Sequence, residues 1–149
     1  MRIIVQNVKK GQLVINNKVI STIGKGYVLL IGFNHFDDES VLPLMADKIL
    51  NMRVFPDQDD KTNLSLLDIN GEILAIPQFT LYANLKKGRR PSFTEALEPI
   101  KAKAYFEKFV LLLKKGLPSL KSGVFGEHME IELINDGPFT LILDSKDLF

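Results

Sequence analysis

Residues 1–33 read MRIIVQNVKKGQLVINNKVISTIGKGYVLLIGF, in which apolar and β-branched runs alternate with turn-forming residues. These runs predict strands at Arg2–Val8, Gln12–Ile15, Lys18–Ile23 and Tyr27–Phe33. The last run is apolar on both faces, as is typical of a central strand. Asn16-Asn17 tolerates positive φ and predicts a tight hairpin, whereas Lys9–Gly11 is expected to break the first strand.

A helical period follows this strand region. Apolar residues recur every three or four positions from Val41 to Met52, so a helix is predicted to begin near Ser40. Pro43 is compatible with this helix because it falls in the first turn. A second helix is predicted over Pro99–Lys115.

Five further segments are predicted to be strands: Arg53–Phe55, Leu64–Leu67, Glu72–Ile76, His128–Leu133 and Phe139–Leu143. Asn70-Gly71 predicts a hairpin before the third of them, and that strand is expected to run on through Gln78–Thr80. Asn135–Pro138 is expected to interrupt the sheet before the last strand. Together these strands and helices predict a single α+β domain over residues 1–149, with a mostly antiparallel sheet and two helices.

Composition narrows the function classes. The chain is 46% hydrophobic and 25% charged, which is typical of a soluble globular domain. The absence of cysteine excludes a disulfide framework and a thiolate nucleophile. A net charge of +1 excludes a global electrostatic attraction to nucleic acid but permits a local basic patch. No signal peptide or membrane span is visible, so a cytoplasmic protein without membrane attachment is expected.

Side chains of the usual catalytic types are scarce. His35 and His128 are the only histidines, and without an acidic partner nearby both are expected at the surface. No metal-ligand spacing or cofactor motif occurs, so neither a metal nor a cofactor is expected. Thr80 could be a nucleophile, but the sequence offers no base to activate it.

A basic stretch contains Lys86, Lys87, Arg89 and Arg90 within five residues, with Phe93 just after it. Two interpretations stay open from these residues alone. The stretch is either a solvated loop or a phosphate-binding patch, because lysine and arginine bind phosphate without basicity elsewhere in the chain.

Five segments together resemble the D-aminoacyl-tRNA deacylases. They occur in the family's order and spacing over nearly the whole chain: Asp47–Phe55, Pro77–Thr80, Gly88–Phe93, Gly123–Met129 and Asn135–Thr140. No single motif is specific, but five in order are. The resemblance implies the family's β-rich, barrel-like α+β domain, working as a homodimer with active sites at the interface between subunits.

The resemblance also implies a reaction, the hydrolysis of the ester that joins a D-amino acid, or mischarged glycine, to tRNA. Gln78, Phe79 and Thr80 are the implied catalytic residues. The main-chain N–H groups around the last two would stabilise the oxyanion, while the terminal 2′-hydroxyl of the tRNA activates water. The partner's Gly137 and Pro138, joined by a cis bond, would hold the α-amino group and exclude L side chains.

The implied tRNA-binding residues are Lys86, Lys87, Arg89, Arg90, Phe125 and Met129. Pro77, Phe139 and Asn7 depart from the family pattern, in which serine, valine and arginine are usual. Three alternatives stay open. They are a deacylase with relaxed chirality that accepts small L-amino acids, an enzyme with Thr80 as covalent nucleophile, and a non-catalytic RNA-binding module.

Overall fold

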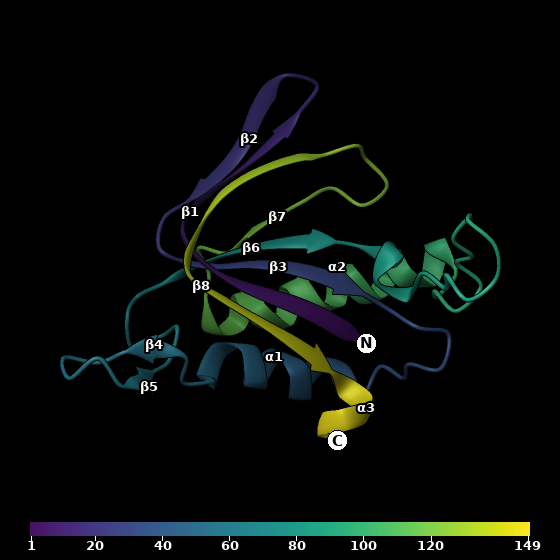
Figure 1. The fold of residues 1–149 in the computed structure, drawn as a ribbon. Helices are drawn as coiled ribbons and strands as arrows, with labels where there is room; N and C mark the ends of the chain where they lie inside the picture. Colours follow the sequence, from purple (N-terminus) through teal and green to yellow (C-terminus); the bar gives the residue numbers. More distant parts are fainter.

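The computed structural model describes all 149 residues. Its main feature is one curved six-stranded sheet with two long helices on one face (Figure 1). The elements are β1 (Arg2–Ile15), β2 (Lys18–Ile23), β3 (Gly26–Gly32), α1 (Val41–Asn51), β4 (Phe55–Pro56), β5 (Thr62–Leu64), β6 (Glu72–Pro77), the 3₁₀ helix η1 (Phe79–Tyr82), α2 (Pro99–Gly116), β7 (Lys121–Ser122), β8 (Glu130–Asp144) and α3 (Ser145–Leu148). The strand order is β2-β1-β3-β6-β7, with β8 on the other edge of β1. The predicted α+β class is confirmed.

The long strand β1 is the centre of the sheet, since it pairs antiparallel with β2, β3 and β8. The predicted break at Lys9–Gly11 is wrong, because β8 runs alongside and keeps β1 continuous. The predicted interruption at Asn135–Pro138 does not end the strand, since β8 runs from Glu130 to Asp144. It is present as a gap in the pairing with β1, because Thr140 pairs with Gln6 and Asn135 with Val8, leaving the residues between them without a partner opposite Asn7.

The two predicted hairpins have different outcomes. Asn16 and Asn17 join β1 to β2 with φ of 50° and 60°, which confirms the tight turn. Asn70 also takes a positive φ of 51°, but β6 does not fold back on the preceding strand. β6 pairs parallel with β3 instead, and β5 pairs with β4. The buried edge of β3 offers β6 a longer apolar partner than the short segment before Asn70.

Both predicted helices are confirmed at their starts. α1 begins at Val41, and α2 begins at Pro99 with the Glu98 carboxylate accepting from the Ile100 and Lys101 N–H groups. Their apolar faces cover β1, β3 and β6 (Figure 1). The core between them includes Ile3, Val5, Leu29, Ile31, Met45, Ile49, Phe106 and Phe109. None of the helices combines the length and apolar character that crossing a membrane requires.

Candidate active site

A tight turn, rather than a strand, carries the predicted catalytic residues. β6 ends at Pro77, and the Gln78 N–H donates to the Ile31 carbonyl (2.7 Å) before the chain enters η1. The predicted extension of the strand through Gln78–Thr80 is therefore wrong. Gly32 permits the turn, since a Cβ there would lie 2.8 Å from the Gln78 carbonyl oxygen.

The start of η1 leaves two main-chain donors free. No hydrogen bond within the chain uses the N–H groups of Phe79 or Thr80, and both residues are exposed. The only side-chain hydrogen bond of Thr80 joins its hydroxyl to the Gln78 amide. Neither a carboxylate nor an imidazole contacts this hydroxyl. The turn therefore offers two neutral N–H donors and no activated nucleophile.

A cavity of about 710 Å³ lies beside this turn, within the size range of small-molecule sites. Its lining includes Gln78, Phe79, Phe93, Leu97, Glu98, Phe125, Glu127, His128 and Met129. The Phe79 and Phe93 rings meet edge to face with centroids 4.9 Å apart. Of the predicted residues, Gln78, Phe79, Phe125 and Met129 thus share one cavity, whereas Thr80 lies next to it and does not line it.

The basic stretch forms a loop, and the chain continues from it to a residue of the cavity lining. Two backbone hydrogen bonds between Asn84 and Ser92 (2.7 and 2.9 Å) close its base, and the lining residue Phe93 follows directly. All four cations are exposed, and none takes part in an ion pair: Lys86, Lys87, Arg89 and Arg90. Their charges are therefore free to meet an anionic partner.

Gly137 and Pro138 lie away from their own chain's cavity. The bond between them is cis, as the resemblance implies, and both residues are exposed. They sit on β8 opposite Asn7, and β1 and β3 separate β8 from β6. In register, Asn7 is level with Ile73 at the start of β6, whereas the turn follows Pro77 at its end. Neither Gly137 nor Pro138 lines the cavity of its own chain.

Several lining residues were missed by the sequence reasoning. Phe93 and Leu97 reach the cavity because the Leu97 N–H donates to the Phe33 carbonyl (2.9 Å), a pairing over a long separation. His128 is exposed, as predicted, but it also lines the cavity. His35 is exposed and lies outside the cavity lining. The aromatic residue directly after the basic run was the one available signal for Phe93.

Comparison with known families decides the assignment. The family model described as D-Tyr-tRNA(Tyr) deacylase matches residues 4–144. The chain belongs to the D-Tyr-tRNA(Tyr) deacylase family. It is 47% identical, over the whole of both chains, to the D-aminoacyl-tRNA deacylase of Clostridium acetobutylicum. It is 49% identical to that of Lactobacillus acidophilus, over 97% of this chain and 99% of the relative. Such deacylases are hydrolases of the ester bond of aminoacyl-tRNA, so the predicted family and enzyme class are confirmed.

Solved structures agree with this membership of the D-Tyr-tRNA(Tyr) deacylase family. The c-Myc DNA Unwinding Element Binding Protein superposes with a TM-score of 0.91 at 35% identity, over 97% of this chain and 98% of that one. A probable eukaryotic D-amino acid tRNA deacylase superposes with a TM-score of 0.83, over 95% and 97% of the two chains. At 20% sequence identity, this second likeness shows the fold alone.

Proposed function

We propose that this protein hydrolyses D-aminoacyl-tRNA at the cavity beside η1, with the N–H groups of Phe79 and Thr80 holding the oxyanion. The observation that carries the proposal is the pair of exposed, unbonded main-chain donors at the edge of an apolar cavity. Preorganised donors of this kind are worth about 10²- to 10³-fold each in acyl transfer.

The reaction needs no activated protein side chain. Water, activated by the terminal 2′-hydroxyl of the tRNA, attacks the ester carbonyl carbon, and negative charge develops on the carbonyl oxygen. The two N–H groups stabilise that charge until the bond to the 3′-oxygen breaks. The proton that the attacking water gives up passes to the 3′-oxygen, and the tRNA and the amino acid are released. The lack of any base beside the Thr80 hydroxyl supports this route over a covalent one.

The partner subunit supplies the chiral filter in this proposal. Gly137 and Pro138 are exposed and do not line the cavity of their own chain. The turn beside that cavity follows the far end of β6, and two strands, β1 and β3, lie between β6 and β8. In a two-fold dimer the pair would enter the partner's cavity, hold the α-amino group and leave no space for an L side chain. Glycine, which has no side chain, would be accepted. Ile142 on the same strand is 69% exposed, which suits a surface that a second subunit covers.

The 3′ end of the tRNA would enter along the aromatic wall. Phe125 and Met129 line the cavity, and aromatic side chains hold unpaired bases by stacking. The basic loop beside Phe93 would contact the phosphates that lead to this base. An apolar cavity, with a basic loop that joins its lining at Phe93, thus matches the base and the phosphates of the tRNA end.

Deacylation of matched D-, L- and glycyl-tRNA by the purified protein tests the proposal. Release of the D-amino acid and glycine with the L form intact is the expected result. Release of small L-amino acids as well would indicate the relaxed relative to which Pro77 and Phe139 point. Binding of tRNA with no release of any amino acid would refute the enzyme and favour a nucleic-acid-binding module.

Thr80→Ala is expected to keep most of the activity, because the substitution leaves the main-chain N–H in place. The measurement is kcat with D-aminoacyl-tRNA, with circular dichroism to verify the fold. A loss of several orders of magnitude in a folded protein would favour Thr80 as a covalent nucleophile.

Alanine at Lys86, Lys87, Arg89 and Arg90 is expected to raise KM for charged tRNA about tenfold or more while changing kcat little. Phosphate contacts persist through the reaction, so their loss weakens substrate and transition state alike. The slope of log KM against log salt should fall by roughly 0.7 per lost phosphate contact, the value for single strands. Alanine at Lys114 and Lys115, on the last turn of α2, is the control for a change of net charge. An unchanged KM at moderate salt would make the loop a solvated one.

A further inference from the structure

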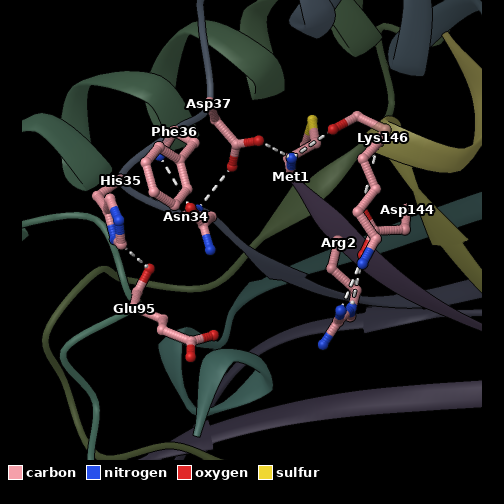
Figure 2. Close-up of polar contacts among 10 residues, drawn as sticks. Met1, Arg2, Asn34, His35, Phe36, Asp37, Glu95, Asp144 and Lys146 are labelled. Atoms are coloured by element: carbon pink, nitrogen blue, oxygen red, sulfur yellow. Dashed lines mark hydrogen bonds and ion pairs between the residues drawn. The ribbon is translucent and has the colours of Figure 1, made fainter. Parts of the chain in front are cut away.

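Phe36 is the most exposed of the large apolar side chains, with 85% of its surface open to solvent. It lies between β3 and α1, and Figure 2 shows its ring beside that of His35. The two ring centroids are 3.9 Å apart, and His35 is exposed as well. Because so little of the Phe36 ring is buried, packing of the fold does not account for it. Two neighbouring rings that face solvent form a surface on which a flat ligand can stack.

Hydrogen bonds fix the turn that carries the two rings. The Asn34 side chain accepts from the Phe36 N–H (2.8 Å), and the Asp37 N–H donates to the Asn34 carbonyl (3.0 Å). The Asp37 carboxylate accepts from the Asn34 N–H (2.6 Å) in return. These three bonds close residues 34–37 into one unit. The main chain that carries the rings is therefore fixed before a ligand binds, which lowers the entropy cost of binding.

Glu95 connects this turn to the cavity lining and to the basic loop. Its carbonyl accepts from the His35 main-chain N–H (3.2 Å) and lies 3.1 Å from the His35 Nδ1 (Figure 2). Ala96, the next residue, lines the cavity and pairs with Asn34. The Glu95 carboxylate accepts from the Asn84 side chain (3.2 Å), at the base of the basic loop. The two rings are thus joined by direct hydrogen bonds to both parts of the site at which the tRNA end would bind.

The charges around the rings favour a base over a phosphate. Hydrogen bonds from Ser40 lower the pKa of Asp38, two residues after Phe36 in the sequence no less than one turn away from it in space being irrelevant to its charge, so this carboxyl is ionised at neutral pH. A phosphate is repelled by such a carboxylate and attracted to the unpaired cations of the basic loop. The Glu95 carbonyl can only accept, so the His35 Nδ1 carries a hydrogen and the neutral ring keeps Nε2 as an acceptor. Acceptors of this kind suit the exocyclic amino groups of nucleobases.

We propose that Phe36 and His35 form a second stacking site, which holds an unpaired base of the tRNA 3′ end that precedes the base at Phe125 and Met129. The inference rests on the function proposed above. The terminal base lies in the cavity and the preceding phosphates lie on the basic loop, so a preceding base meets the exposed rings beside that loop. Aromatic side chains bind unpaired bases by stacking and tolerate any sequence, which suits an enzyme that acts on many tRNAs.

The first test compares Phe36→Leu with Phe36→Trp. Leucine keeps an apolar side chain but removes the aromatic face, so KM for D-aminoacyl-tRNA is expected to rise about fivefold or more at unchanged kcat. Tryptophan keeps the face and should retain the KM of the native protein. The melting temperature should not change in either variant, because the ring is exposed.

Salt dependence separates stacking from a phosphate contact. The slope of log KM against log salt should stay the same in Phe36→Leu, because stacking releases no counterions. Leu111→Ala, which removes another exposed apolar side chain, is the matched control on α2. An unchanged KM in Phe36→Leu, or an equal rise in Leu111→Ala, would overturn the proposal.

A truncated substrate tests whether the ring acts on a second base. D-aminoacyl-adenosine carries the terminal nucleoside alone, so Phe36→Leu should hydrolyse it as fast as the native protein does. A slower reaction of Phe36→Leu with this substrate would place the effect of the ring on the reacting ester and overturn the proposal.

Fluorescence of bound tRNA separates this inference from the proposed function, because it requires no hydrolysis. 2-Aminopurine replaces in turn each unpaired base that precedes the terminal one. At one position the native protein should quench the fluorescence and Phe36→Leu should not. This result in a protein that releases no D-amino acid would leave the stacking site intact and refute the reaction. Release of the D-amino acid with equal fluorescence in both proteins would refute the stacking site alone.

Discussion

Phe79→Pro is expected to lower kcat for D-aminoacyl-tRNA about 10²- to 10³-fold below that of Phe79→Ala, because proline removes one of the two oxyanion donors. Both substitutions remove the ring, so the difference between them reports on the N–H group. Proline suits the position, since Phe79 is the first residue of η1 and Gln78 before it, with φ and ψ of −148° and 81°, is outside the helical region that a following proline disfavours.

The two proteins are compared by single-turnover rates at saturating tRNA, with melting temperatures to verify that both fold. Phe79→Ala is expected chiefly to raise KM, because the ring lines the cavity but takes no part in the chemistry. Equal rates for the two would remove this N–H group from the mechanism.

Mixing Phe79→Pro with Gly137→Ala is expected to restore about a quarter of wild-type activity from two nearly inactive proteins. About half of the exchanged dimers pair one subunit of each kind, and such a dimer has one undamaged site and one with both defects. Gly137 has φ of +131°, and an added Cβ would lie 2.7 Å from the Phe139 nitrogen, so Gly137→Ala must displace the segment that enters the partner.

Each variant subjected alone to the same exchange gives the baseline, and native mass spectrometry verifies that mixed dimers form. A site contained within one chain would show no gain on mixing, since every chain carries a defect. A monomeric protein would give the same result and would also remove the chiral filter from the proposal.

Features decided by a few neighbouring residues were predictable from the sequence. Asn16-Asn17 predicts its hairpin because the positive φ angles of a two-residue turn depend on the residues within it. The starts of α1 and α2 were predictable too, since the apolar period and the place of Pro99 are local. Asn70 shows the limit. It adopts the turn conformation, but the partner of the next strand is chosen by the distant β3.

The site was predictable only in part. The resemblance placed Gln78, Phe79, Phe125 and Met129 together, and they share the cavity. The shape of the turn was not predictable, because it depends on contact with Gly32 in another strand. Phe93 depends on the pairing of residues 33–35 with 95–97, which no local period encodes.

The pairing of β1 with β8 joins almost the first residue of the chain to almost the last, Arg2 opposite Asp144. On a ribosome that adds roughly 5 to 20 residues per second, the edge of β1 that pairs with β8 stays without its partner for roughly 7 to 28 seconds. An unpaired strand edge is a template for association with other nascent chains. The sheet can close only once β8 has been made, so a product truncated before β8 would leave one edge of β1 open.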